Sequence, residues 1–300
     1  MVYPISGDRA RLVCRMVAAV IYDRKTGEIA EEKVFESGAT RFLYDTVPGG
    51  VCLAFLRLPA INRLYGAFQK SGWSKKKIEK LVRDYDMGEI QSEYASFNDF
   101  ITRKEARGFE GQAHVFIAPA DSCMIARTIE KGVVFSIKGR NYLLSRFLGD
   151  EQKALAYEGG LCLIFRLRVY DYHRFCFVDD GIIQSEKQIS GFLDSVNTNQ
   201  TGRFTLSSNS RRISHLRLAN FGDIVFAEVG AMLVGRIVHT YSGASFHKGD
   251  EKGYFEFGGS SIVILIKKGV VKVDDDILAY SAKGIETKVE YGERIGIKYA

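Results

Sequence analysis

The strongest constraint on the fold is a series of short apolar segments that starts near residue 112 and continues through the rest of the chain. These segments are rich in Val, Ile, Phe and Leu, and read HVFIAPA, GVVFSI, LCLIFRLRV, DIVFAEVGAMLVGRIV, SSIVILI and KGVVKV. Turns containing Gly or Asp separate them, as is typical of consecutive antiparallel strands. Only NYLLSRFLGD, residues 141–150, has a helical pattern in this half. The sequence therefore predicts a mainly antiparallel β-rich domain over residues 106–300.

The preceding residues have a pattern that is typical of helices. Residues 74–87 carry apolar side chains at helical spacing, and Ser74 is a candidate N-cap. The opposite face of that helix is basic, with Lys75, Lys76, Lys77, Lys80 and Arg83. A second short helix is predicted over residues 96–104, with Ser96 or Asn98 as its cap. We therefore expect an α+β protein in which N-terminal helices precede the β-rich domain.

The helical region, residues 1–105, is expected to associate with membranes. An apolar segment over residues 49–68 precedes the basic helix. The basic face has two interpretations, a solvated surface or an amphipathic face that rests on anionic lipid. The formal net charge of +6 favours an acidic partner. Because no nucleic-acid-binding motif is visible, an anionic membrane surface is favoured over nucleic acid.

Cysteine usage and hydropathy indicate the cellular compartment of the protein. Five cysteines form no CxxC pair, and their odd number is atypical of a disulfide scaffold, which favours a reducing compartment. No apolar run reaches the length of about eighteen residues that suggests a spanning helix. We expect a peripheral protein on the cytoplasmic face of the cell membrane. The histidines and cysteines show no zinc-ligand spacing, so no metal is expected.

One stretch, EKGYFEFGGSSIVILI at residues 251–266, carries two possible meanings. Two strand-like runs flank Gly258, Gly259, Ser260 and Ser261. Gly-Gly and Ser are ordinary turn formers, so a plain β-hairpin accounts for this pattern. Alternatively, a serine hydroxyl attacks the preceding carbonyl and the chain cuts itself, because glycines allow backbone angles that bring the two groups together.

Three separated segments favour the second interpretation, namely IAPADS at 117–122, YDYHRFCFVDDG at 170–181 and FEFGGSS at 255–261. In this order they resemble phosphatidylserine decarboxylase of the bacterial proenzyme type. Further similarity lies outside these motifs, in SEYASFNDFITRK, SIKGRNYLLSRFLGD, NFGDIVFAEVGAMLVGRIV and KGDEKGYFEFGGSS. The resemblance runs from about residue 20 onward. It implies a β-rich fold of barrel-sandwich type behind N-terminal helices, and it suggests a homodimer.

The resemblance also implies a chemistry. Ser260 attacks the carbonyl of Gly259, and the resulting ester eliminates to leave a pyruvoyl group on a small α chain, 260–300, beside a β chain, 1–259. The pyruvoyl carbonyl then forms a Schiff base with the amine of phosphatidylserine and acts as an electron sink as CO2 leaves, which gives phosphatidylethanolamine.

A serine needs a base before it can attack. The resemblance assigns Asp121 to a relay with Ser260, and His173 to a position near decarboxylation, as a proton donor. The chain departs from the family at two positions, since Ser122 replaces a glycine and Cys176 replaces the relay histidine. A thiol serves as a base only if its pKa is lowered. Three interpretations remain: Cys176 substitutes as the base, His173 covers both roles, or the protein is an unprocessed relative.

Two other functions compete with the main hypothesis. One is a pyruvoyl-dependent decarboxylase that acts on a soluble amino acid, although the apolar segment 49–68 beside a basic helix favours a lipid substrate. The other is a catalytically inactive lipid-binding relative that has lost processing because of Cys176.

Overall fold

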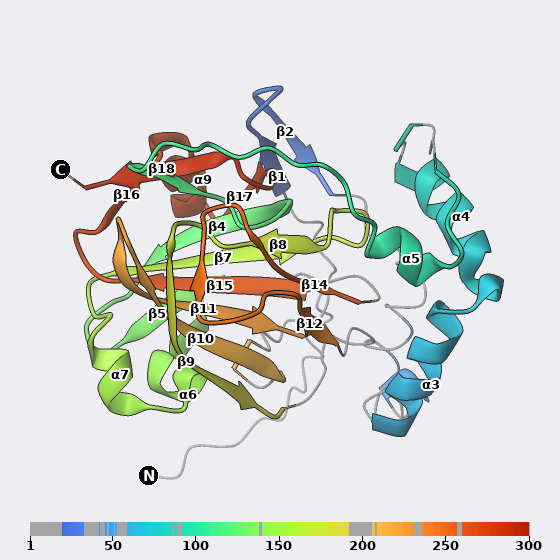
Figure 1. Cartoon of the computed structure of the whole chain (residues 1–300), viewed down its shortest axis with the longest axis horizontal. Coiled ribbons are helices and arrows are strands. Elements are labelled where there is room, and N and C mark those ends of the chain that lie inside the picture. The colour runs from blue at the N-terminus through green and yellow to red at the C-terminus, as the bar shows by residue number, and fades with distance from the viewer. Residues whose placement is uncertain are drawn as a thin grey trace, which may run out of the picture.

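The computed structural model describes residues 20–32, 42, 46, 48–50, 52, 59–85, 87–88, 92–137, 140–191, 206–207, 209–230, 236–256 and 260–299. These residues form an α+β structure that is dominated by antiparallel sheets and has few helices (Figure 1). Both coarse predictions, the α+β class and the mainly antiparallel pairing, are confirmed.

A ten-stranded sheet forms the centre of the described structure. Its strands follow one another in this spatial order: β13 (Ser245–Phe246), β9 (Gly181–Ile189), β10 (Arg211–Leu218), β11 (Gly222–Val229), β15 (Ser260–Ile266), β7 (Leu161–Leu167), β4 (Ser122–Thr128), β17 (Glu286–Val289), β1 (Val20–Asp23) and β2 (Glu28–Glu31). Neighbours pair antiparallel, except for the parallel pair of β1 and β17.

Three smaller sheets accompany it. The first has the order β12 (Ile237–His239), β14 (Glu251–Phe255) and β8 (Arg174–Cys176). The second has the order β16 (Val271–Val273), β18 (Arg294–Lys298) and β3 (Val115–Ile117), and the third is the hairpin of β5 (Val134–Ile137) and β6 (Arg140–Leu143). Among the described strands no sheet closes into a barrel, so the barrel-sandwich prediction is not confirmed.

Strand β15 shows why the apolar run SSIVILI does not alternate with polar residues. Ile262 and Ile264 enter a core between the large sheet and the smaller sheets, which contains Phe175 and Phe255. Val263 enters a second core on the opposite face, which α6 (Leu144–Leu148) helps to cover. Because successive strand residues point to opposite faces, a strand buried on both faces is apolar throughout.

The helices are short and lie around this framework. They are α3 (Pro59–Gln69), η1 (Gly72–Lys75), α4 (Lys76–Tyr85), α5 (Phe97–Ile101), α6, α7 (Glu151–Leu155) and α9 (Asp275–Ala282). Helices α3, α4 and α5 group together at one side of the sheets (Figure 1). Leu81 of α4 forms a small core with Phe97 and Phe100 of α5, and Val169 and Tyr170 from the loop after β7 pack against it. Helices α4 and α5 therefore dock on that loop.

Local details correct part of the sequence reading. Ser74 lies inside η1 rather than at a cap, and its hydroxyl accepts a hydrogen bond from the Phe97 N–H. Ser96 is the N-cap of α5, where its side chain accepts from the Asp99 N–H. The predicted helix over 141–150 is divided between β6 and α6. Residues 20–31 form β1 and β2 of the large sheet, so the expected helical region over 1–105 is wrong for them. Most of the other residues in 1–58 lie outside the described residues, where the helical region stays a prediction.

Candidate active site

The register of three neighbouring strands places two of the predicted site residues at the same end of the large sheet. Ser260, the first residue of β15, pairs with Leu167 of β7. Arg166 of β7 pairs with Ser261 on one side and with Cys123 of β4 on the other. By the same register, Ser122 of β4 continues the row of Ser260 and Leu167, and Asp121 lies one residue beyond that row. Adjacent strands are about 4.8 Å apart, so Ser122 lies roughly 10 Å from Ser260, and Asp121 is next to it in the chain.

Ser260 is fully buried, and its hydroxyl is unusual for a buried polar group. Its Oγ has no hydrogen-bond partner within the described structure. Most buried polar atoms are paired, because leaving one unpaired costs about 1–3 kcal/mol. Gly258 and Gly259, predicted to form the cleavage turn with Ser260, lie outside the described residues. Ser260, the predicted nucleophile, is thus described by the structure, whereas both its role and the turn before it stay predictions.

Asp121 is held by two donors at its place before β4. Its Oδ1 accepts from the Tyr291 backbone N–H over 2.8 Å, and its Oδ2 accepts from Arg107 over 3.2 Å. Burial raises the pKa of Asp121 above its usual value, and these two donors only partly offset that effect. The carboxyl is fixed in orientation and is more basic than an exposed aspartate.

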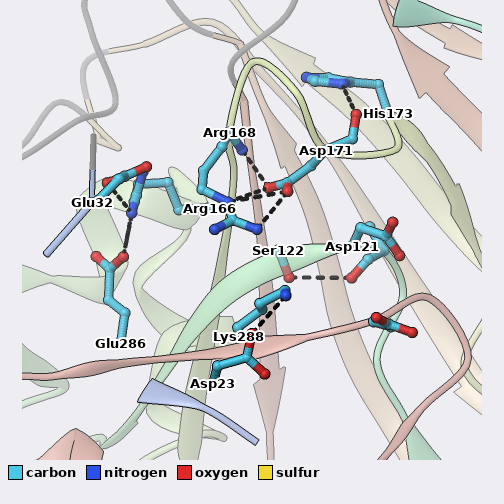
Figure 2. Close-up of polar contacts among 12 residues, drawn as sticks. Asp23, Glu32, Asp121, Ser122, Arg166, Arg168, Asp171, His173, Glu286 and Lys288 are labelled. Atoms are coloured by element: carbon cyan, nitrogen blue, oxygen red, sulfur yellow. Dashed lines mark hydrogen bonds and ion pairs between the residues drawn. The ribbon is translucent and has the colours of Figure 1, made fainter. Parts of the chain in front are cut away.

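His173 is fully buried in the loop that leads into β8. Its Nδ1 lies 2.9 Å from the Asp171 carbonyl oxygen (Figure 2). Burial lowers the pKa of His173 to about 4, and the nearby Asp171 only partly offsets the shift. The imidazole is therefore neutral at pH 7. With Nδ1–H donating to the carbonyl, Nε2 carries the lone pair that can accept a proton.

Cys176 is also fully buried, on β8. Its backbone N–H donates to the Pro119 carbonyl over 2.9 Å, which ties β8 to the motif that contains Asp121. Burial raises the pKa of the Cys176 thiol to about 12, although a side-chain hydrogen bond with Tyr291 acts in the opposite direction. The thiol is protonated at neutral pH, whereas a base at this position needs a lowered pKa.

A cavity of about 430 Å³ opens beside Asp121. Its charged lining has two basic residues, Arg168 and Lys288, and more acidic ones, namely Asp23, Glu31, Glu32, Asp121 and Asp171. Arg168 binds Asp171 through two nitrogens, and Lys288 donates to Asp23 over 2.7 Å (Figure 2). The cavity thus presents groups of both signs, which suits a small ligand that carries both an ammonium and anionic groups.

The sequence reading missed these charged residues. Arg168 and Asp171 sit just before His173, so their position next to the motif was an available signal. Lys288 and Asp23 come from β17 and β1, near opposite ends of the chain, and only the parallel pairing of those strands brings them together. Local sequence carried no sign of that contact.

The described residues contain no group of three or more His, Cys, Asp and Glu side chains that could hold a metal ion. In the same part of the chain no helix is both long enough and apolar enough to cross a membrane. The candidate site residues are thus a buried hydroxyl, a neutral imidazole and a half-buried carboxyl beside a cavity with charges of both signs.

Residues 97–297 match the family model for phosphatidylserine decarboxylase. The chain belongs to the phosphatidylserine decarboxylase family. Phosphatidylserine decarboxylase proenzyme 2 of Clostridium acetobutylicum is 42% identical over 288 residues, which cover 93% of this chain and 99% of that protein. The phosphatidylserine decarboxylase proenzyme of Clostridium botulinum, strain Langeland, is 37% identical over 290 residues, covering 92% and 98%. That of Clostridium tetani is 37% identical over 290 residues, covering 93% and 98%.

The match with phosphatidylserine decarboxylase proenzymes extends over most of the chain and includes all three motifs. It favours a decarboxylase of this family over an inactive lipid-binding relative. Cys176 still has to be explained, because it replaces the relay histidine of the family and its thiol is protonated at neutral pH.

Proposed function

We propose that the chain decarboxylates phosphatidylserine to phosphatidylethanolamine, after it cuts itself between Gly259 and Ser260 into a β chain, 1–259, and an α chain, 260–300. The observation that carries the proposal is the buried, unpartnered Ser260 hydroxyl at the end of a central strand, in a member of this family. Asp121 and the charged cavity lie at the same end of the sheet as Ser260, although the pairing of Lys288 with Cys123 puts this cavity residue on the face opposite to the Ser260 side chain.

A pyruvoyl group derived from Ser260 suits this position. The serine is the first residue of β15, so a new chain end there keeps both neighbouring strands, β7 and β11. Burial of the position excludes water from a reactive carbonyl. Once formed, the group supplies an electron sink for the pair left behind when CO2 departs.

The cavity beside Asp121 is the proposed head-group site. A phosphatidylserine head group carries an ammonium, a carboxylate and a phosphate, and Arg168, Asp171 and Lys288 offer partners of both signs. Both basic residues of the cavity are paired, Arg168 with Asp171 and Lys288 with Asp23, so binding exchanges these ion pairs for others. Such an exchange selects a ligand with both signs of charge, because a purely anionic ligand leaves the acidic groups unpaired.

His173 is proposed to handle the proton at the carbon from which CO2 leaves. Its imidazole is neutral above a pH of about 4, so it can accept a proton during the reaction and then return it. Cys176 is a weaker candidate for the base in self-cleavage, because burial keeps its thiol protonated. It lies in the apolar core behind the site with its hydrogen bond to Tyr291.

We further propose that, within residues 1–105, the helical group after β1 and β2 attaches the catalytic domain, 106–300, to an anionic membrane at its cytoplasmic face. Three apolar side chains are exposed in the helical group, Leu64, Phe68 and Trp73, of which Trp73 is 86% exposed. Lys75 and Lys76 are exposed beside Trp73. Apolar insertion and basic residues act together at an anionic surface. The homodimer suggested by the family resemblance is part of the same proposal.

Intact-mass analysis with a decarboxylation assay tests the proposed function. Wild-type protein is expected to contain a fragment that starts at residue 260 with a blocked N-terminus, and to release CO2 from phosphatidylserine vesicles. Ser260→Ala removes the attacking hydroxyl and is expected to stay full-length and inactive. Ser261→Ala is the matched control, because it removes the neighbouring buried hydroxyl and should still be cut. A wild type that stays full-length after long incubation supports the unprocessed, lipid-binding alternative instead.

A further inference from the structure

A buried ionic cluster lies between the large sheet and the β12–β14–β8 sheet. Glu228 of β11 and Lys252 of β14 are both fully buried, and Lys252 Nζ donates to Glu228 Oε1 over 2.5 Å. His239 of β12 places its Nε2 3.3 Å from the same oxygen. Ser214 of β10 accepts from Lys252 over 3.0 Å. Burying charged groups costs desolvation free energy, so a buried ion pair is weak evidence for stability alone. The position of this cluster relative to Ser260 therefore decides whether it can have another role.

The register of β11 and β15 puts Glu228 on the same face of the sheet as Ser260. Glu228 pairs with Ile262, and paired residues point to the same face. Ser260 lies two residues before Ile262, so its side chain points to that face as well. Glu228 and Ser260 are therefore diagonal neighbours on adjacent strands, with Cα atoms roughly 7–8 Å apart. A glutamate side chain spans most of that distance.

Both residues also have an unpartnered atom. Glu228 uses Oε1 for Lys252, whereas its Oε2 has no hydrogen-bond partner within the described structure. The Oγ of Ser260 has none there either. Two buried, unsatisfied atoms on one face of adjacent strands, one an acceptor and the other a hydroxyl, are complementary in chemistry. We propose that Glu228 is the group that accepts the Ser260 hydroxyl proton during self-cleavage.

The proposed step is balanced within the chain. As the Ser260 Oγ forms a bond to the Gly259 carbonyl carbon, its proton passes to Glu228 Oε2, and the carbonyl electron pair moves to the carbonyl oxygen. When the carbon–nitrogen bond breaks, the Ser260 nitrogen takes the proton back from Glu228. The products are an ester, a free amine and the original carboxylate, so no other reactant is consumed.

Lys252 and His239 keep the Glu228 carboxyl ionised, which it must be in order to accept a proton. Burial alone would raise the pKa of Glu228, but Lys252 and His239 outweigh that effect and hold the pKa below its ordinary value. The carboxylate is therefore ionised before the attack begins. This arrangement offers the chain a proton acceptor that does not depend on Cys176, whose thiol is protonated.

The inference rests on the proposed function, and its test is the rate of self-cleavage of freshly folded full-length precursor, followed on a denaturing gel. Glu228→Gln is expected to slow cleavage by about 10²- to 10⁴-fold, the usual loss for a general base. Because this change leaves Lys252 buried beside a neutral amide, the double variant Glu228→Gln with Lys252→Met removes both charges. It is expected to fold, as judged by circular dichroism and melting, and still to cleave at the slow rate.

A second carboxylate provides the matched control. Glu186 of β9 belongs to the same polar region, where it accepts from Ser214 over 2.7 Å, but it lies two strands beyond β11. Glu186→Gln is expected to cleave within threefold of wild type. If the folded double variant cleaves within threefold of wild type, the ionic cluster is only structural and the inference is overturned. A wild type that never cleaves overturns the proposed function instead, and this inference with it.

Discussion

The backbone N–H of Tyr291 donates a hydrogen bond to Asp121 Oδ1 over 2.8 Å. The hydroxyl of the same tyrosine hydrogen-bonds with the Cys176 thiol and donates to the Gly249 carbonyl over 3.0 Å. Tyr291 thus stands between the two residues that the family resemblance places in one relay. In this chain Asp121 and Cys176 are connected through a third residue, which separates the thiol from the carboxyl that would orient a base.

Replacement of Cys176 by alanine should change self-cleavage little. The thiol is protonated at neutral pH because burial raises its pKa to about 12, so its loss removes no base. We expect a Cys176→Ala cleavage rate within about threefold of wild type in a gel time course, against the 10²- to 10⁴-fold loss of a true base. Cys176→His restores the family residue and should cleave at least as fast as wild type. A hundredfold loss in Cys176→Ala would assign the base to this thiol.

The acid stability of the protein should depend on His173. Its pKa is about 4 in the folded state and near 6.5 when unfolded, so the unfolded chain binds more protons between these pH values. The neutral imidazole therefore contributes stability above pH 6.5 that is lost as the pH falls toward 4, on the order of 3 kcal/mol. We expect urea unfolding of wild type to lose that much more free energy over this window than His173→Asn. Parallel pH profiles for the two proteins would contradict the assigned shift.

Membrane attachment should depend on Trp73. Trp73→Ala removes the most exposed of the three apolar side chains in the helical group, and we expect about a tenfold weaker affinity for anionic vesicles in a sedimentation assay. Leu155→Ala is the control, because Leu155 is 56% exposed on α7, away from that group. Equal losses for the two variants would indicate a general effect of surface hydrophobicity.

The cavity should recognise the lipid head group through Lys288. Lys288→Met is expected to raise KM for a short-chain phosphatidylserine about tenfold and to change kcat little, since the lysine lines the cavity and not the reacting serine. Lys25→Met is the matched control. Lys25 pairs with Glu290, and its side chain is 65% exposed outside the cavity. A drop in kcat with unchanged KM would place Lys288 in the chemistry instead of in binding.

The strands were the most predictable part of the fold. Runs such as LCLIFRL and SSIVILI are buried on both faces, so their composition marks them directly. The order of strands was not predictable, because β1 pairs with β17 across almost the whole chain length. The helix expected at 141–150 forms only over residues 144–148, because β6 pairs with β5 through residue 143 and this pairing outweighs the helical pattern there.

The site shows the same division between local and distant signals. Ser260, Asp121 and His173 sit in motifs that can be read along the chain. Glu228 could not be recognised in this way. Its position relative to Ser260 depends on the pairing of Glu228 with Ile262, and its ionisation depends on Lys252 from another sheet. A buried glutamate inside an apolar strand, as in DIVFAEV, is the only local hint.

Strand β15 lies between β11 and β7, with hydrogen-bonded neighbours along both edges. Residues 260–299 also supply β16, β17 and β18, and the last two of these pair with strands from the other side of the proposed cut. After the cut, the two pieces would remain one body held by sheet hydrogen bonds and shared cores. Once unfolded, however, they would drift apart, and recovery would need two molecules to meet, so its rate would fall on dilution. Only the uncut precursor can refold as a single molecule. Self-cleavage is therefore expected to take place after folding, and refolding of the two cut chains would not restore the precursor.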